Sequence, residues 1–329
     1  MIGRRALLGS AAAATLGRPA RADPALVLPA LTLIVGAPPG TNTDLLARSF
    51  APFLERHLPS RRVDIRNVPG EGGLLAYRTL AETRPDGGVL GWVATPSLSA
   101  RAVDHADRSL LTRLRLLGAV QREPVAFVCP AGSPIASAQE LIRRSAARRD
   151  AVPLGTPPAG SPGHLAALEL QVAGGTPLNI VAFPSATAAR QAVLAGNLAA
   201  AAIGLGDVTT DLRDGRLTVL GIASAMPSDA AAGLPSSQEA GLQGAGLPMS
   251  VTIRRGLAGP AGLTDELVAT VSAAMRAVAA DPEFAAQAGH SGFAVDWQDG
   301  PSWSLIAMEE RAMLVKLWRV NPWLVSGTG

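Results

Sequence analysis

Cysteine is almost absent from this chain of 329 residues, which contains only Cys129. A single thiol cannot form an intrachain disulfide, so a disulfide-stapled fold is excluded. Cys129 ends an apolar run that starts at Val125, and free cysteines in such runs behave as small buried hydrophobes. We therefore predict a buried strand position for Cys129 and not a reactive thiol.

Histidine is also scarce, with four residues in the chain. His57, His105, His164 and His290 show neither H-x-x-x-H nor H-E-x-x-H spacing, and no cysteine cluster accompanies them. Zinc sites are built from such closely spaced ligands. The sequence therefore predicts no metal site and no cofactor.

Long hydrophobic runs are missing as well. A helix that spans a bilayer needs about 20 apolar residues, and no run in the chain reaches that length. Residues 1–22 predict an export signal, because Arg4-Arg5 precedes a short apolar stretch and Ala20-Arg21-Ala22 has the small-x-small pattern of a cleavage site. The arginine pair favours the twin-arginine route, with the general secretory route as the alternative. We expect cleavage near Ala22 and a soluble mature protein.

No excess of positive charge remains once this leader is set aside. The whole chain has 29 basic and 26 acidic residues, but four of the arginines and none of the acids lie in residues 1–22. The mature chain then carries 25 basic residues against 26 acidic ones. A nucleic-acid-binding protein needs a basic surface, so we expect no nucleic-acid partner.

Strand-like and helix-like segments alternate along the rest of the chain, which predicts parallel sheets built from βαβ units. The pattern runs once from Leu31 to Ala94 and restarts at Val125, which predicts two α/β lobes. We assign residues 23–122 and 251–329 to lobe 1 and residues 123–250 to lobe 2. Predicted strands are residues 31–35, 63–66, 89–94, 125–128, 151–154, 178–183, 198–203, 217–223 and 250–258. Predicted helices are residues 44–58, 74–83, 137–149, 163–172, 186–195, 265–280 and 302–318, and residues 226–248 form a long connection.

Two similar loops follow strands in the two halves of the chain. The first is Val35 to Asp44 (VGAPPGTNTD) and the second is Leu154 to His164 (LGTPPAGSPGH). Each leads into a predicted helix, and the backbone N–H groups at a helix start bind anions. Because ligands of open α/β sheets bind beyond the carboxyl ends of the strands, we expect both loops at one cleft. Two such loops could hold a small carboxylate without a charged side chain, which indicates a binding protein more than an enzyme.

Three side chains near these loops have two possible roles each. His164 lies in the first turn of the second loop's helix, where it either donates a hydrogen bond to the ligand or caps and packs locally. Asp44 lies in the first turn of the first helix, where the helix dipole favours an acid. We predict a structural cap for Asp44, because its charge would repel a carboxylate. Trp92 ends a predicted strand, and we favour a core position over one at the cleft.

Two enzyme-like motifs are incomplete. Gly289 to Phe293 (GHSGF) has phenylalanine where the nucleophile motif G-x-S-x-G needs its last glycine, and no clear strand precedes it. Gly204 to Thr209 (GLGDVT) lacks the third glycine of a dinucleotide-binding fingerprint. We interpret this second segment as a strand-to-helix turn that lines the cleft.

Several short motifs along the chain match a family pattern in their order and spacing. Val35 to Asp44 is similar to V-P-F-P-P-G-G-G-T-D, Asn67 to Gly73 to N-R-P-G-A-G-G, Pro85 to Leu90 to P-D-G-Y-T-L-L, and Gly155 to Ala166 to G-S-A-G-x-G-S-x-x-H-L-A. Gly215 to Leu217, Glu239 to Leu242 and Gly259 to Gly262 are similar to G-K-L, E-A-G-L and A-P-A-G. Over nearly all of its mature length the chain therefore resembles the tripartite tricarboxylate transporter substrate-binding proteins, the Bug or TctC family.

The resemblance implies a periplasmic protein with the two-lobed, periplasmic-binding-protein-like fold of type II. Each lobe would be a mostly parallel sheet flanked by helices, and a small organic carboxylate would bind in the cleft between the lobes. The ligand carboxylate would be held by backbone N–H groups, hydroxyls and water, and the protein would deliver its ligand to membrane transporter subunits. We also expect a monomer. By position, the expected ligand-binding residues are Pro39, Gly40, Thr41, Asn42, Ala94, Thr95, Ser161, Pro162 and His164.

The chain also departs from the family pattern. Thr41 and Asn42 replace two glycines of the first loop, and Arg254 stands where a tryptophan is common. The Q-V-D-L-M-F strand reads Asn197 to Ala202 (NLAAAA), and the tyrosine-lysine-glycine turn reads Phe183 to Ser185. These changes indicate a divergent member with either a shifted ligand preference or a degenerate site.

The leading interpretation is a solute-binding protein that closes around its ligand by a hinge motion and catalyses nothing. An exported enzyme acting on a small carboxylate is the alternative, and it would need a nucleophile–base pair or perturbed acids in the cleft. A periplasmic ligand-sensing partner of a signalling receptor is a third interpretation, which the neighbouring genes would separate from transport. The identity of the carboxylate is not encoded in any motif of the chain.

Overall fold

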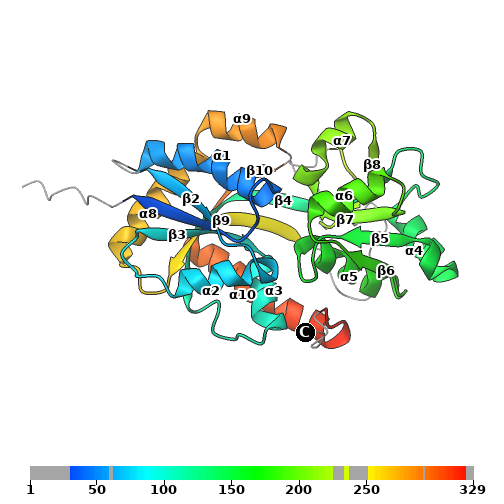
Figure 1. Ribbon diagram of the computed structural model, residues 1–329, viewed down its shortest axis with the longest axis horizontal. Coiled ribbons are helices and arrows are strands. Elements are labelled where there is room, and N and C mark those ends of the chain that lie inside the picture. Colours follow the sequence, from blue (N-terminus) through cyan, green and yellow to red (C-terminus); the bar gives the residue numbers. More distant parts are fainter. Residues whose placement is uncertain (1–29, 59–61, 225–232, 237–250, 292, 324–329) are drawn as a thin grey trace, which may run out of the picture.

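The computed structural model describes residues 30–58, 62–224, 233–236, 251–291 and 293–323 (Figure 1). The predicted export signal and nearly all of the predicted connection at residues 226–248 lie outside these ranges. Within the described ranges, no helix has the length and apolar character needed to cross a membrane.

The first lobe starts with parallel βαβ units, as the alternation of segments predicts. Its central strand β1 pairs in parallel with both β2 and β3. Leu31, Leu33 and Val35 of β1 are fully buried, because helices cover both faces of the sheet. In chain order, the elements are β1 (Leu31–Val35), α1 (Asn42–His57), β2 (Val63–Asn67), η1 (Glu71–Gly73), α2 (Leu74–Ala81), β3 (Val89–Thr95) and α3 (Ser97–Asp104).

A single long strand, β4 (Leu114–Pro130), belongs to both lobes. Its first part, from Leu114 to Pro124, pairs with β9 (Thr252–Pro260). Its last part pairs with β7 (Ala200–Gly204) and β8 (Leu217–Ile222), and all three pairings are antiparallel. The predicted strand at 125–128 covers only the second part. The first part was not predicted as a strand, because it contains the polar residues Gln121 and Glu123. Both are fully buried in the structure.

The second lobe repeats the parallel arrangement around β5, which pairs with β6 and β7. The predicted helix caps are present, since Ser137 Oγ accepts the N–H of Glu140 and Pro162 occupies the first position of α5. In chain order, the elements are α4 (Ala138–Ala147), η2 (Arg149–Ala151), β5 (Pro153–Thr156), α5 (Pro162–Gly174), β6 (Asn179–Ala182), α6 (Ala186–Leu194), β7 (Ala200–Gly204), η3 (Leu205–Asp207), α7 (Thr209–Arg213) and β8 (Leu217–Ile222).

The chain then returns to the first lobe through β9, and α8 packs against α1. The C-terminal helix α10 contacts both lobes, because Trp303 packs with α2 and α3 while Leu314 and Leu317 join the core of the second lobe. The assignment of residues 23–122 and 251–329 to lobe 1, and of residues 123–250 to lobe 2, remains a prediction. The last elements are α8 (Asp265–Ala279), α9 (Pro282–His290), β10 (Ala294–Asp299) and α10 (Gly300–Val320), of which α9 and β10 were not predicted.

The fold is the predicted two-lobed α/β arrangement, with one refinement. The parallel order holds for β1 to β3 and for β5 to β7, but β4, β8, β9 and β10 join as antiparallel strands, so each sheet is mixed. The antiparallel pairs arise where the chain crosses between lobes, outward along β4 and back along β9. Figure 1 shows this pair crossing the middle of the molecule, between the blue and green lobes.

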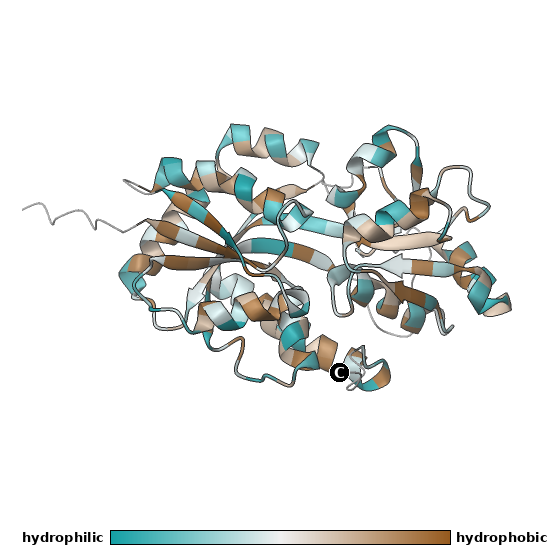
Figure 2. Cartoon of the chain, in the orientation of Figure 1, coloured by the Kyte–Doolittle hydropathy of each residue, from teal (hydrophilic) through white to brown (hydrophobic). Residues whose placement is uncertain are grey.

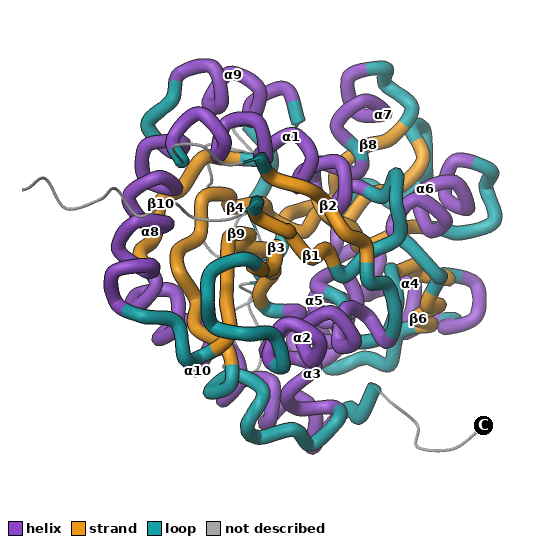
Figure 3. Tube along the Cα trace, turned by 60° about the vertical axis from the view of Figure 1, so that its left-hand side comes forward, coloured by secondary structure: helices purple, strands orange, loops and turns teal. Residues whose placement is uncertain are grey.

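The core lies between the sheets and the helices that cover both of their faces (Figure 3). Apolar residues concentrate in the strands, and polar residues on the outer helix surfaces (Figure 2). Trp92 is 3% exposed and its ring centroid lies 4.9 Å from that of Phe50. Cys129 is buried in β4. The core positions predicted for Trp92 and Cys129 are thus confirmed.

Candidate ligand-binding site

A cavity of about 380 Å³ lies between the two lobes. Its walls come from the ends of strands and the starts of helices, where the strand-end rule for α/β sheets predicts a ligand. A larger hollow, of about 560 Å³, is open to the surface and lined by the second lobe only, at the C-terminal end of α4. Because this second hollow contains no helix N-terminus, the cavity between the lobes is the stronger candidate for an anionic ligand.

Four helices begin at the wall of this cavity. The first residues of α1, α3, α5 and α6 are Asn42, Ser97, Pro162 and Ala186, and all four line it. Helix N-termini carry partial positive charge and unpaired N–H groups. The backbone N–H groups of Asn42 and Gly163 have no acceptor among the described residues. The cavity therefore offers free donors from both lobes to an anion.

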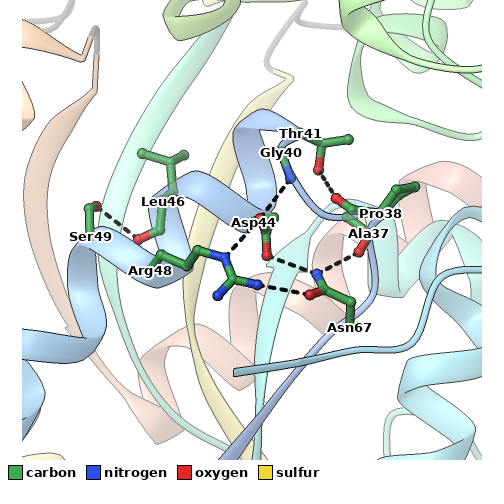
Figure 4. A network of polar contacts seen from close by, with 9 residues as sticks. All are labelled: Ala37, Pro38, Gly40, Thr41, Asp44, Leu46, Arg48, Ser49 and Asn67. Carbon is green, nitrogen blue, oxygen red and sulfur yellow. Dashed lines mark hydrogen bonds and ion pairs between the residues drawn. The ribbon is translucent and has the colours of Figure 1, made fainter. Parts of the chain in front are cut away.

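The first loop is held in shape by the side chain of Asp44 (Figure 4). Its carboxylate accepts hydrogen bonds from the backbone N–H of Gly40 at 2.8 Å, from Asn67 Nδ2 at 2.8 Å and from Arg48 Nε at 3.0 Å. Burial raises the pKa of Asp44, but the bonds from Arg48 and Asn67 outweigh it and leave the pKa below its ordinary value. Asp44 is 1% exposed and does not line the cavity. The predicted capping role is confirmed.

The second loop is held by local bonds of the same kind. Ser161 Oγ accepts the N–H of His164 at 3.3 Å, and His164 Nδ1 accepts the N–H of Gly160 at 3.4 Å. Burial, followed by the nearby charge of Arg101, lowers the pKa of His164 to about 4. The neutral imidazole thus stabilises the loop by a local hydrogen bond. Of the two roles predicted for His164, this is local capping and packing.

The cavity brings together five of the nine residues expected to bind ligand. Thr41, Asn42, Ala94, Ser161 and Pro162 line it, whereas Pro39, Gly40, Thr95 and His164 do not. The Thr95 side chain points away from the cavity, because its Oγ1 accepts a hydrogen bond from Trp303 Nε1 at 3.0 Å and the residue is fully buried. The turn at Gly204 lines the cavity, as its interpretation as a cleft-lining turn predicts.

Arg101 is a cavity residue that the sequence did not reveal. Its Nη2 donates to the carbonyl oxygen of Ala159 at 2.9 Å and forms an ion pair with Asp104. Burial lowers the pKa of Arg101 and raises that of Asp104. Arg101 therefore connects α3 of the first lobe with the second loop, while its charge is balanced within α3.

Arg255, Glu123 and Asp207 form a second charged group at the cavity. Arg255 and Glu123 are buried and form an ion pair, and Glu123 Oε1 also accepts the N–H of Gly206 at 2.8 Å. Asp207 lines the cavity beside them. Burial, together with the charge of Glu123, raises the pKa of Asp207 to about 7.

These charged residues were missed for identifiable reasons. Arg101 lies in α3, a helix of eight residues that the sequence did not predict. Arg255 lies in β9 between Arg254 and Gly256 and forms part of no recognisable motif. The turn Phe183 to Ser185 was noted only as a departure from the family, yet it follows a strand and opens α6, and the strand-end rule could have placed it at the cavity.

No group of three His, Cys, Asp or Glu side chains that could hold a metal ion occurs in the part of the chain that the structure describes.

Comparison with known proteins identifies the family of the chain. Residues 46–311 match the sequence profile of the tripartite tricarboxylate transporter family receptor, TctC. The chain belongs to this family. The resemblance inferred from the motifs is therefore confirmed, and the relatives form a family of periplasmic solute-binding receptors.

Two curated relatives share low sequence identity with this chain over most of its length. A UPF0065 protein of Bordetella bronchiseptica is 26% identical over 260 residues, which cover 78% of this chain and 75% of that protein. BugT of Bordetella pertussis is 27% identical over 241 residues, which cover 70% of this chain and 71% of BugT.

Several solved structures share the fold of this chain. MatC of Rhodopseudomonas palustris, with bound malate, is similar with a TM-score of 0.78 at 20% identity, covering 88% of this chain and 99% of MatC. An R. palustris protein with adipate gives a TM-score of 0.78 at 20% identity, covering 89% and 97%. The periplasmic binding protein BugD gives 0.77 at 20% identity, covering 90% and 98%. At these identities the likeness establishes the two-lobed fold.

Proposed function

We propose that the chain is exported to the periplasm, captures a small organic carboxylate between its lobes and delivers it to a tripartite tricarboxylate-type membrane transporter. The observation that carries the proposal is the convergence of four helix N-termini on one cavity. Their dipoles and unpaired N–H groups favour an anion without a net positive charge on the protein. The carboxylates bound to two proteins of the same fold, malate and adipate, support this ligand class.

We propose binding without catalysis. The hydroxyl groups at the cavity come from Thr41, Ser97 and Ser161 among others. The imidazole of His164 accepts a hydrogen bond from the N–H of Gly160, and His164 does not line the cavity. Among the described residues, no hydroxyl of the cavity donates a hydrogen bond to His164 or to Asp207, the acid with a raised pKa, so no nucleophile is paired with a base for hydrolysis of a carboxylate derivative.

The experiment that tests this proposal is a thermal-shift screen of the purified protein against small carboxylates. A ligand that binds only the folded state adds about 2.7 kcal/mol of stability at one hundred times its dissociation constant. We expect one chemical class of carboxylate to raise the melting temperature. If no carboxylate does so, the proposal fails.

A matched pair of variants ties the binding to the helix N-terminus. Asn42→Asp places a negative charge at the start of α1 inside the cavity, where it competes with the ligand for the same N–H groups. We expect at least a tenfold loss of affinity, about 1.4 kcal/mol. Ser302→Asp adds the same charge to the exposed first turn of α10, outside the cavity lining, and should leave affinity unchanged. Equal affinity of the two variants would contradict the proposed site.

A further inference from the structure

Asp207 is the carboxyl group of the cavity that the protein leaves without a partner. Its carboxylate has no hydrogen bond and no ion pair among the described residues, whereas its backbone carbonyl accepts a bond from Arg190 Nη1 at 3.1 Å. The residue is partly exposed, and it faces the cavity. A carboxylate left without partners at the wall of an anion site needs a physical explanation.

The charges around Asp207 do not balance it. Arg255 forms an ion pair with Glu123, whose other oxygen accepts the N–H of Gly206. A methyl group added at Gly204 would contact both Glu123 Oε1 and Asp207 Oδ2, so the two carboxylates flank the same glycine. One guanidinium at this place therefore faces two acids.

Other elements around this turn carry two further arginines, Arg190 on α6 and Arg213 on α7. Arg190 lies 3.5 Å from Asp211, which also forms an ion pair with Arg216, and the charge of Arg190 partly offsets the rise in the pKa of Asp207. Arg213 is exposed and donates to the carbonyl oxygen of His290 at 2.9 Å. On the side of α9, the carbonyl of Ser291 approaches Gly206, and the His290 ring is bonded to its own helix through Nδ1 and the carbonyl of Ala286 at 2.8 Å. Across the cavity, the charge of Arg101 is balanced by Asp104.

A second anion in this cavity would therefore meet a negative charge that Arg255 and Arg190 offset only in part. Two carboxylates that share a site of low polarity cannot both ionise without a large cost, and one of them takes up a proton. A protonated carboxyl group can donate a hydrogen bond to a carboxylate, and such charge-assisted bonds are strong.

We propose that Asp207 carries a proton when a carboxylate is bound, so that ligand binding is coupled to the uptake of one proton by the cavity. The inference rests on the proposed function and specifies its regulation by pH. Burial and Glu123 already raise the pKa of Asp207 to about 7 in the empty cavity. Above that pH the carboxyl group of Asp207 is ionised in the empty cavity and must take up a proton on binding. The affinity for ligand should therefore fall about tenfold for each pH unit above it.

The first test is calorimetric titration with malate and adipate at pH 6.0 and 8.5, in buffers of different ionisation enthalpy. We expect uptake of nearly one proton per ligand at pH 8.5, little uptake at pH 6.0, and an affinity about thirtyfold lower at pH 8.5. Asp207→Asn keeps a donor and an acceptor without the charge. This variant should bind with equal affinity at both pH values and take up no proton. Binding without proton uptake at pH 8.5 in the wild type would overturn the inference.

Two further variants show which carboxyl group is responsible. Asp214→Asn makes the same chemical change at a residue with a 53% exposed side chain outside the cavity lining, and should behave as the wild type. Glu71→Gln removes the other acid of the cavity wall, whose side chain is 57% exposed. The pH dependence should survive in Glu71→Gln, and its loss there would overturn the assignment to Asp207.

A ligand-free measurement separates this inference from the proposed function. If neither malate nor adipate binds at either pH, nor any carboxylate in the screen, the proposed function fails. Titration of the aspartate carboxyl carbons by NMR, in the wild type and in Asp207→Asn, then still determines the charge state of Asp207. An Asp207 that titrates near the ordinary pKa of an aspartate overturns the crowding of the two carboxylates from which the inference is argued, and one that titrates near pH 7 supports it.

Discussion

Substituting Gly163 with alanine should displace the start of α5 and weaken the second loop. Gly163 is the second residue of α5 and is buried against β7. An added Cβ would overlap the carbonyl oxygen of Ala202 and lie 2.8 Å from Pro157 Cδ and 3.0 Å from the carbonyl carbon of Ala202. These partners are backbone and a proline ring, so none of them can rotate away.

The expected cost follows from two opposing effects. Overpacking a rigid site costs about 1–3 kcal/mol, while alanine gains up to about 1 kcal/mol over glycine within a helix. We expect Gly163→Ala to lower the free energy of unfolding by about 1–2 kcal/mol. Because α5 must move away from β7, its N-terminus also moves, and the melting-temperature increase with carboxylates should shrink.

Gly289 provides the matched control. It is an exposed glycine within α9, and an added Cβ would have no neighbour within 4 Å. Gly289→Ala should therefore keep or slightly raise stability through helix propensity alone. Urea unfolding of the wild type and both variants measures the difference. A Gly163→Ala protein as stable as the wild type would refute the close approach of α5 to β7.

Further outcomes can be checked on the same protein. Asp44→Ala should cost about 1–3 kcal/mol for each buried donor left unsatisfied, whereas the exposed Asp64→Ala should stay within about 0.5 kcal/mol of the wild type. Because the folded pKa of Asp44 is lowered, its stabilisation holds above the unfolded pKa and is lost as pH falls through the folded value, so the two stability curves should converge in acid. His164 has a folded pKa of about 4 against 6.5, so the wild type should lose about 3 kcal/mol relative to His164→Gln as pH falls from 6.5 to 4. Thr95→Val should leave a buried indole N–H unsatisfied, lowering stability by about 1–3 kcal/mol without changing ligand affinity. Cys129 should react with a thiol reagent only after denaturation, because it is buried and burial raises its pKa; rapid native labelling would contradict its core position.

Local patterns predicted the fold because most strands and helices follow simple periodicity. The strand from Leu31 to Val35 is apolar because both of its faces are covered, and the caps at Ser137 and Ser161 mark helix starts through their own side-chain bonds. The first part of β4 was not predictable in this way. Its buried Gln121 and Glu123 resemble surface residues in sequence, and the ion pair that allows Glu123 to be buried comes from Arg255, 132 residues away.

The same distinction applies to the site. Backbone donors at a strand–loop–helix turn can be inferred from glycine and proline spacing, and the loops at Asn42 and Ser161 both line the cavity. The direction in which a side chain points cannot be inferred so easily. Thr95 ends a strand at the cavity, yet it turns inward to the indole of Trp303, while its neighbour Ala94 lines the wall. That choice depends on α10, which lies more than 200 residues further along the chain.

The charges of the cavity and its helix N-termini serve different purposes. Both guanidinium groups at the wall are matched by buried acids, Arg101 by Asp104 and Arg255 by Glu123. They hold the lobes and the turn in position without giving the cavity a net positive charge. Attraction for an anion then comes from backbone dipoles, which fade within about one helical turn and depend on the position of the ligand. In such a cavity one unpaired acid has a large effect, because no surplus cation offsets it. Protonation of Asp207 should therefore change the affinity for ligand more than the replacement of either ion pair, Arg101–Asp104 or Arg255–Glu123, by two neutral side chains of the same shape.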